Sequence, residues 1–160
     1  MPRIGITGHS ALSDGTAGLV ADGLRAVLAG HEADELVGVT CLARGADQIF
    51  ARVVLELGGS VEVVLPAADY RARKVKPANA TDFDDLIARA ASVHVMPLPE
   101  SNRAAYQAAG AHVMANVDEM VAVWDGAPSD GAGGTGDTVR TAREQGIPVT
   151  IVWPTGAVRA

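Results

Sequence analysis

Val121-Ala122-Val123-Trp124-Asp125-Gly126 is a short apolar run that ends in an acidic turn, and Gly133-Gly134-Thr135-Gly136-Asp137-Thr138 follows it a few residues later. The first stretch is apolar throughout, as in a buried strand, and a helical pattern begins in the second. A glycine-rich loop between a strand and a helix presents backbone N–H groups to a bound phosphate. We therefore interpret the two stretches as half of a nucleotide pocket in an α/β fold.

Apolar runs and helical patterns alternate along the rest of the chain. The other runs, bounded by Gly, Pro or polar residues, occupy residues 4–7, 36–41, 61–65, 93–96 and 149–153. Helical patterns of apolar side chains lie at residues 20–28, 49–57, 83–90, 102–117 and 137–145. Since parallel neighbours need crossovers, this alternation predicts an α/β fold: a Rossmann-like, doubly wound, mostly parallel sheet of about six strands flanked by helices. Runs that are apolar throughout indicate strands buried on both faces.

The bulk composition fits one domain and restricts its partners. With 160 residues, 48% of them hydrophobic, the chain suffices for one core, so we expect residues 1–160 to form a single domain. The net charge is -6 and the 13 basic residues are scattered, which disfavours a nucleic-acid surface. No run approaches the roughly 18 apolar residues of a membrane span, and no secretory segment precedes the first strand. We therefore expect a cytoplasmic protein that contacts neither nucleic acid nor membrane.

Four residues mark expected ends of helices. Thr81, with Asp84 three residues later, resembles a capping box at a helix start. Gly58 and Gly146 each follow a helical pattern, where a left-handed residue commonly ends the helix. These positions predict where three of the helices begin or end.

Two further features concern packing. Cys41, the one cysteine, ends an apolar run, so we interpret it as a small buried residue rather than a nucleophile. Gly110 lies inside the alanine-rich segment 102–117 and indicates close packing against a neighbour. That segment is either a self-association interface of a homo-oligomer or part of the core of the domain.

In a doubly wound sheet the ligand lies beyond the carboxyl ends of the strands, where the strand order reverses. Gly8, His9 and Ser10 follow the first strand, where the glycine lets a ligand approach and the two side chains donate hydrogen bonds. The alternative for these three residues is a tight turn with a solvated histidine. Arg44 and Gly45 follow the second strand, and the planar guanidinium of Arg44 suits a phosphate.

Charged and polar residues near two of these loops have structural alternatives. Asp47 falls in the first turn of a helix, where a carboxylate interacts well with the helix dipole, so it is either a ligand residue or purely structural. Ser101 is the expected N-cap of the segment that follows it. Glu100 and Arg103 lie near the expected crevice, and the alternative for both is a solvated surface charge.

The last loop is interpreted as the phosphate site rather than as a flexible linker. It joins a strand to a helix inside one domain, and Asp125 and Gly126 leave the strand tip where a ribose hydroxyl is received. The residues expected to hold the phosphate are Gly133, Gly134, Thr135, Gly136 and Thr138. Neither common phosphate fingerprint is present, which argues against an ATPase or a standard NAD dehydrogenase.

Several motifs together resemble the Rossmann-like superfamily that includes the DprA/Smf proteins and the Lonely Guy phosphoribohydrolases, often mislabelled lysine decarboxylases. The motifs are Gly5-Ile6-Thr7-Gly8-His9, Ala43-Arg44-Gly45-Ala46-Asp47, Leu65-Pro66, Ala105-Tyr106 with Ala109-Gly110, Trp124-Asp125-Gly126 and the glycine-rich loop. The resemblance extends from Ile4 to Pro154. It implies a parallel sheet that binds nucleotides or nucleotide-derived ligands, and it also implies self-association.

The chain departs from that pattern at the catalytic position. Lonely Guy enzymes follow their glycine-rich loop with a glutamate that assists cleavage of the N-glycosidic bond. Aligning the loops places Asp137 at the family's threonine, and Val139 and Arg140 stand where the glutamate is expected. The catalytic residue is therefore unknown, with Asp125, Asp137 and Glu100 as the candidate carboxylates.

Three hypotheses follow from the sequence. The first is a domain that binds or senses a nucleotide or nucleotide-derived molecule, with no metal ion and no separate cofactor. The second is an N-glycosidase that acts on a nucleoside 5′-monophosphate through an acidic residue in the same pocket. The third is an assembly module whose pocket is vestigial.

Overall fold

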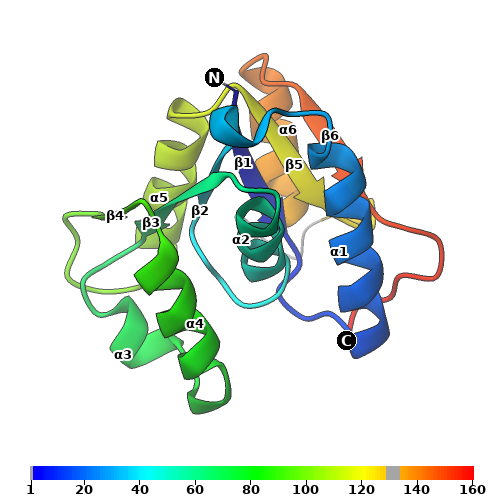
Figure 1. The fold of residues 1–160 in the computed structure, drawn as a ribbon. Coiled ribbons are helices and arrows are strands. Elements are labelled where there is room, and N and C mark those ends of the chain that lie inside the picture. The colour runs from blue at the N-terminus through cyan, green and yellow to red at the C-terminus, as the bar shows by residue number, and fades with distance from the viewer. Residues whose placement is uncertain (1, 129–133) are drawn as a thin grey trace.

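Six strands form one parallel sheet in the computed structural model, which describes residues 2–128 and 134–160 (Figure 1). The strands are β1 (Arg3–Gly8), β2 (Val37–Thr40), β3 (Ser60–Leu65), β4 (Ser92–Val95), β5 (Glu119–Val123) and β6 (Val149–Val152). Their order across the sheet is β4-β3-β2-β1-β5-β6, and every neighbouring pair is parallel. The predicted α/β fold with a doubly wound parallel sheet is confirmed.

Helices cover both faces of the sheet. Among the described residues they are α1 (Asp14–Leu28), α2 (Ala46–Glu56), α3 (Tyr70–Lys74), α4 (Pro77–Arg89), α5 (Arg103–Ala115) and α6 (Thr135–Glu144), with a 3-10 turn at Ala33–Glu35. Figure 1 shows α1 and α2 on the near face of the sheet and α5 and α6 behind it. In that part of the chain, no helix is long and apolar enough to cross a membrane.

The hydrophobic core has two parts, one on each face. Leu24 of α1 and Phe50 of α2 are fully buried with Ile4 of β1 on one face. On the other face, Val113 of α5 packs in a cluster with Val39 of β2. Because successive strand residues point to opposite faces, apolar strands fill both parts at once. This explains why the central strands are apolar throughout.

The strand order reverses between β1 and β5. Strands β1 to β4 follow one another outward in one direction, and the chain then returns to place β5 on the other side of β1. Gly8 at the end of β1 pairs in register with Val123 at the end of β5. The loops that follow these two strands therefore diverge over opposite faces, which leaves a crevice at their carboxyl ends.

The two edge strands differ from the sequence expectation. Val93 and Val95 of β4 are 41% and 43% exposed, and Ile151 of β6 is 39% exposed. The expectation that apolar runs are buried on both faces is therefore wrong at the edges. An edge strand has one neighbour, and the helices cover the centre of the sheet better than its margins.

The predicted helix ends are partly correct. Gly58 and Gly146 have φ angles of 85° and 76° directly after α2 and α6, which confirms both predicted carboxyl ends. The capping box at Thr81 and Asp84 is wrong, because α4 begins earlier, at Pro77. Proline has no N–H to satisfy and a helical φ angle, so it starts a helix without a capping side chain.

Candidate functional site

A cavity of about 350 Å³ opens at the carboxyl ends of β1 and β5, here called the switch-point cavity. The described residues that line it are Thr7, Gly8, His9, Ser10, Trp124, Ala127, Pro128, Gly134, Thr135, Gly136 and Arg159. The structure thus brings together six of the residues that the sequence proposed for the ligand: Gly8, His9, Ser10, Gly134, Thr135 and Gly136. Sequence reasoning missed Thr7, Trp124, Ala127, Pro128 and Arg159 as lining residues.

Gly8 is required by the packing around the strand tip. A Cβ atom at this position would lie 2.6 Å from Cβ of Ala46 and 2.8 Å from Cβ of Val123. Both distances are far shorter than a van der Waals contact between carbon atoms. The glycine therefore allows β1, β5 and α2 to meet closely at the floor of the cavity.

His9 is held by the loop that follows β5. Its side chain is 7% exposed, and Nε2 accepts a hydrogen bond of 3.1 Å from the backbone N–H of Asp125. Its ring meets Trp153 edge to face, with 5.5 Å between the ring centroids. Burial lowers the pKa of His9 and the positive charge of Arg159 lowers it further, against the opposing effect of Asp125. His9 is therefore expected to be neutral near pH 7.

Asp125 lies beside the cavity rather than on its lining. Its carboxylate accepts a 2.9 Å hydrogen bond from the N–H of Ala127, Oδ1 is 3.3 Å from Nε2 of His9, and Oδ2 is 3.7 Å from the guanidinium of Arg159. The bond from Ala127 is the main cause that holds the pKa of Asp125 below its usual range, and the neighbouring His9 and Arg159 act in the same direction. The turn continues through Gly126, whose φ angle of 85° favours glycine.

The amino terminus of α6 forms another wall of the cavity. Gly134 is the N-cap and supplies no capping side chain, and the bond from the N–H of Thr138 to its carbonyl oxygen is 3.1 Å long. The N–H groups of Thr135 and Gly136 precede this bond, at the positively polarised end of the helix. Thr138 itself points away from this cavity, and Gly133 lies outside the described residues.

Arg159 reaches the cavity from the far end of the sequence. Its backbone forms an antiparallel bridge with Leu12 in the loop between β1 and α1. On either side, the N–H of Val158 donates to Oγ1 of Thr16 at 2.8 Å and the N–H of Ala160 donates to the carbonyl of Ala11 at 3.0 Å. No motif marks this segment, because its position depends on where β6 ends relative to the first loop.

The loop after β2, which the sequence also predicted to bind the ligand, packs against the first loop instead of lining the switch-point cavity. Gly45 has a φ angle of 87°, and a Cβ atom there would lie 2.5 Å from the carbonyl oxygen of Ser10. The N–H of Ala46 donates to the carbonyl of His9 at 3.2 Å. The start of α2 is thus covered by the backbone of the first loop. Arg44 is exposed, and neither Arg44 nor Gly45 is among the residues that line the switch-point cavity.

Asp47 has a structural environment at the start of α2. It is 8% exposed, and its carboxylate accepts a 3.2 Å hydrogen bond from the N–H of Ala43. Burial raises the pKa of Asp47 to about 7, against the opposing effect of that bond. Cys41 is partly rather than fully buried, and it packs against the cluster that contains Val39. Burial also raises the pKa of its thiol well above the usual range, which agrees with a packing role for this cysteine.

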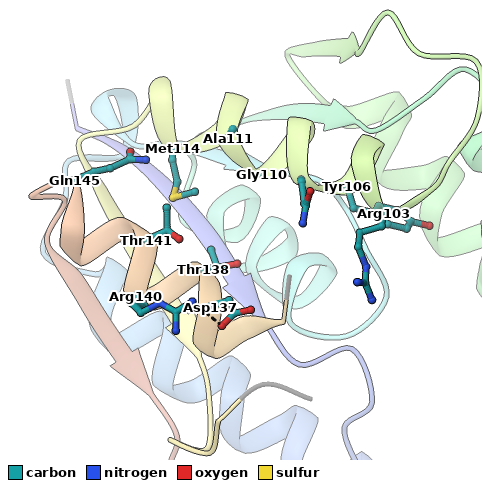
Figure 2. A pocket seen from close by; sticks show the side chains of 11 residues that line it. Arg103, Tyr106, Gly110, Ala111, Met114, Asp137, Thr138, Arg140, Thr141 and Gln145 are labelled. Carbon is teal, nitrogen blue, oxygen red and sulfur yellow. Dashed lines mark hydrogen bonds and ion pairs between the residues drawn. The ribbon is translucent and has the colours of Figure 1, made fainter. Parts of the chain in front are cut away.

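A larger cavity of about 600 Å³ separates α5 from α6, here called the interhelical cavity (Figure 2). It is lined by Arg103, Tyr106, Gln107, Gly110, Ala111, Met114, Asp137, Thr138, Arg140, Thr141 and Gln145. Asp137 accepts a 3.1 Å hydrogen bond from Arg140, one turn along the helix. A Cβ atom at Gly110 would meet no atom within 4 Å, so the expected close packing at this glycine is wrong.

Glu100 lines neither the switch-point cavity nor the interhelical cavity. It lines a hollow of about 310 Å³ with Asp69, Arg73, Lys74, Ser101 and Asn102. The predicted N-cap Ser101 instead donates its hydroxyl to Asp69 at 2.7 Å, and Asn102 caps α5 by accepting from the N–H of Ala105. Four strand spacings separate β4 from β5, or roughly 19 Å. The three candidate carboxylates Asp125, Asp137 and Glu100 therefore do not share one cavity.

The described residues contain no group of three His, Cys, Asp or Glu side chains placed to hold a metal ion. The chemistry on offer at the switch-point cavity is instead that of hydrogen-bond donors. They are two helix-terminal N–H groups, a buried imidazole and a guanidinium, beside one ionised carboxylate. Such a set receives an anion and positions a hydroxyl.

Comparison with known proteins identifies the fold. No protein-family model and no curated protein match the chain. The DNA processing protein A (DprA) of Streptococcus pneumoniae superposes with a TM-score of 0.69 at 20% identity, over 98% of this chain and 52% of that protein. The chain therefore spans about half the length of that relative.

Two further structures agree. The DNA processing protein A of Helicobacter pylori, described with a single-stranded DNA binding mode, gives a TM-score of 0.69 at 15% identity, over 99% of this chain and 68% of that protein. The Moco carrier protein of Chlamydomonas reinhardtii gives 0.54 at 18% identity, over 94% and 75%. The superfamily resemblance predicted from the sequence motifs is thus confirmed at the level of the fold, which this chain shares with the DNA processing A proteins and the Moco carrier protein.

Proposed function

We propose that the chain binds a nucleotide or a nucleotide-derived molecule in the switch-point cavity. The observation that carries the proposal is the meeting of the glycine-rich start of α6 with the tip of β1 at the point where the strand order reverses. The ligand's phosphate lies against the N–H groups of Thr135 and Gly136. Its ribose hydroxyl is received by the carboxylate of Asp125 at the edge of the cavity.

The size and the donor set of the cavity support this proposal. A volume of about 350 Å³ falls at the small end of the range typical of ligand pockets. A single helix terminus contributes roughly 0.3 to 1 kcal/mol to binding a charge, whereas micromolar affinity requires about 8 kcal/mol. The several segments that meet at this cavity are therefore needed together to hold a ligand.

The comparisons support a ligand that contains phosphate. One protein of the same fold is described as a Moco carrier and another by its mode of single-stranded DNA binding. For this chain a net charge of -6 disfavours a long polyanion, because each bound phosphate of a strand needs a nearby cation. We therefore favour a small nucleotide over a nucleic acid strand.

The second candidate function is cleavage of an N-glycosidic bond, and one observation favours it. The carboxylate of Asp125 is ionised and next to the cavity, as a group that stabilises an oxocarbenium ion must be. Asp137 pairs with Arg140 on the interhelical cavity, and Glu100 lies near the far edge of the sheet. Asp125 is therefore the carboxylate to which we assign this role.

The binding proposal is tested by the Gly134→Val variant. A β-branched side chain at this lining position fills the space in front of the N–H groups, so we expect it to abolish thermal stabilisation by the nucleotide that stabilises the wild type most. The measurement is the melting temperature with a panel of nucleoside mono-, di- and triphosphates and with a single-stranded oligonucleotide. Gly30→Val is the matched control. Gly30 follows the carboxyl end of α1, on the side of the sheet where the strands begin, and a Cβ atom there would meet no atom within 4 Å.

The outcomes separate the candidate functions. Equal stabilisation of wild type and Gly134→Val would refute a phosphate site at the start of α6. Stabilisation by the oligonucleotide alone would show that the ligand is a nucleic acid strand rather than a nucleotide. Chromatography of the same mixtures for free base decides whether the bound nucleotide is also cleaved.

A further inference from the structure

We propose that Arg159, carried by the C-terminal segment that crosses the loop between β1 and α1, is the cation that binds the ligand's phosphate in the switch-point cavity, with Nδ1–H of His9 as a second donor. This inference rests on the proposed function for the nucleotide itself. It transfers to Arg159 the role that the sequence suggested for Arg44. It also makes the C-terminal segment a wall of the binding site.

The guanidinium of Arg159 is placed to bind an anion. It is half-exposed and lines the cavity, and none of its N–H groups has a hydrogen-bond partner among the described residues. Its one ion-pair partner among the described residues is Asp125, at 3.7 Å, a distance too long for a hydrogen bond. An arginine presents five N–H donors in a planar fork, which matches the oxygens of a phosphate.

The backbone of Arg159 is fixed independently of its side chain. Three main-chain contacts on consecutive residues tie this segment to the first loop and to α1: the N–H of Val158 to Oγ1 of Thr16, the bridge to Leu12, and the N–H of Ala160 to Ala11. The side chain therefore starts from an ordered position, which lowers the entropy lost when it binds a ligand. Removing the side chain leaves these three contacts in place.

The hydrogen-bond pattern of His9 defines its free donor. Nε2 accepts from the N–H of Asp125, and a nitrogen that accepts a hydrogen bond carries no proton. The proton of the neutral ring is therefore on Nδ1, which has no partner in the part of the chain described. Since His9 lines the cavity, this N–H is available to a ligand.

The charges around the cavity favour an anion held between these groups. Arg159 contributes a full positive charge, and the start of α6 contributes about half of one. Asp125 is the negative group next to Arg159, and the N–H of Ala127 already occupies part of its carboxylate. A phosphate that approaches the α6 terminus therefore meets Arg159 as its cation. Arg44 is exposed and outside the cavity lining, so it provides the comparison.

The experiment measures what the phosphate adds to binding. Adenosine and adenosine 5′-monophosphate are titrated by calorimetry into wild type, Arg159→Ala, Arg159→Lys and Arg44→Ala, and inorganic phosphate is titrated by ³¹P NMR into the same proteins. For Arg159→Ala we expect a loss of about tenfold or more in affinity for the monophosphate and for phosphate. Affinity for adenosine stays unchanged. Arg159→Lys recovers part of the loss, because it keeps the charge without the fork, and Arg44→Ala binds all three as the wild type does.

Each result has one reading. An equal loss for adenosine and the monophosphate would show a structural effect and overturn the inference, as would a larger loss in Arg44→Ala than in Arg159→Ala. If neither adenosine nor the monophosphate binds the wild type, an adenine nucleotide is not the ligand, and the phosphate titration alone decides the role of Arg159. If the wild type binds neither phosphate nor the monophosphate, the proposed role of Arg159 is overturned.

The part of His9 has its own test. His9→Gln places an amide oxygen where Nε2 accepts and removes the donor at Nδ1, so we expect it to weaken phosphate binding severalfold while leaving adenosine binding unchanged. ¹⁵N NMR of the histidine ring shows which nitrogen carries the proton. A proton on Nε2 in the neutral wild type would remove His9 from the site.

Discussion

The helices α2 and α6 begin alike in sequence and differently in space. Each starts after a glycine N-cap without a capping side chain and has an aspartate in its first turn. The start of α2 is covered by the carbonyls of His9 and Ser10, and Asp47 is buried behind it. The start of α6 opens on the switch-point cavity instead. A glycine at a helix start thus has two uses: it lets another backbone approach, or it leaves N–H groups free for a ligand.

The sheet order explains the difference. Strand β2 lies next to β1 on the side where the chain continues outward, so the loops after β1 and β2 pack on one another. Strand β5 lies on the other side of β1, where the helices that follow the two strands go to opposite faces. Only the second pair leaves a crevice. The comparison therefore predicts that changes at α2 affect folding and changes at α6 affect ligand binding.

The largest effect is expected for Gly45→Ala. The φ angle of 87° is unfavourable for alanine, and the new Cβ would lie 2.5 Å from a backbone oxygen that cannot move freely. We expect a loss of more than about 3 kcal/mol in the free energy of unfolding. Urea unfolding followed by circular dichroism measures it, and a loss below about 1 kcal/mol would contradict the close packing of the first two loops.

The second prediction concerns the pH dependence of stability through Asp47. Its pKa in the folded protein, about 7, lies above its ordinary value of 3.8, so the folded state holds the proton more tightly than the unfolded state. The resulting stability is fully present below about pH 4 and is lost as the pH rises through 7. Asp47→Asn keeps an acceptor for the N–H of Ala43 and has no proton to lose.

The wild type should therefore lose stability between pH 5 and pH 8 while Asp47→Asn does not. The free energy of unfolding of the variant minus that of the wild type should rise by on the order of 2 kcal/mol from pH 5 to pH 8. Urea titrations of both proteins at the two pH values give this difference directly. A difference that is the same at both pH values would show that Asp47 titrates normally and is not buried as described.

The smallest effect on folding is expected for Gly134→Ala, the counterpart of Gly45→Ala. Gly134 has φ and ψ angles of -77° and 177°, an extended conformation that any residue adopts. Alanine is a poorer N-cap than glycine, so the expected loss is within about 1 kcal/mol. The same urea unfolding measures it. A loss as large as that of Gly45→Ala would erase the proposed distinction between the two helix starts.

The sequence predicted those residues of the site that come directly after a strand or begin the helix that follows it. Gly8, His9 and Ser10 follow β1 directly, and Gly134 to Gly136 begin α6, so a correct order of elements placed them at one sheet edge. Arg44 follows β2 just as directly and still lies outside the cavity lining. A strand end indicates which edge a residue occupies but not which neighbouring loop covers it.

The helix α3 shows the same limit in the fold. Its five residues, Tyr70–Lys74, are too few to show a helical period. Tyr70 at its start packs against the rings of Phe83 and Tyr106, which lie on other helices. Likewise the apolar runs of β4 and β6 resemble those of the central strands, and only the strand order makes them edges. In each case the missing information was the identity of a neighbour.

By itself the sequence determined the α/β class, the alternation of strands and helices and the glycine-rich start of α6, because period, apolar runs and glycine act over a few residues. Tertiary structure alone decided that Asp137 and Thr138 face α5, that Asp125 meets His9, and that Arg159 enters the cavity. The contacts of Asp125 with His9 and of Arg159 with the first loop join residues 100 or more positions apart. Asp137 and Thr138 line the interhelical cavity rather than the switch-point cavity. Local patterns carry no information about either, because both depend on the order in which the strands assemble.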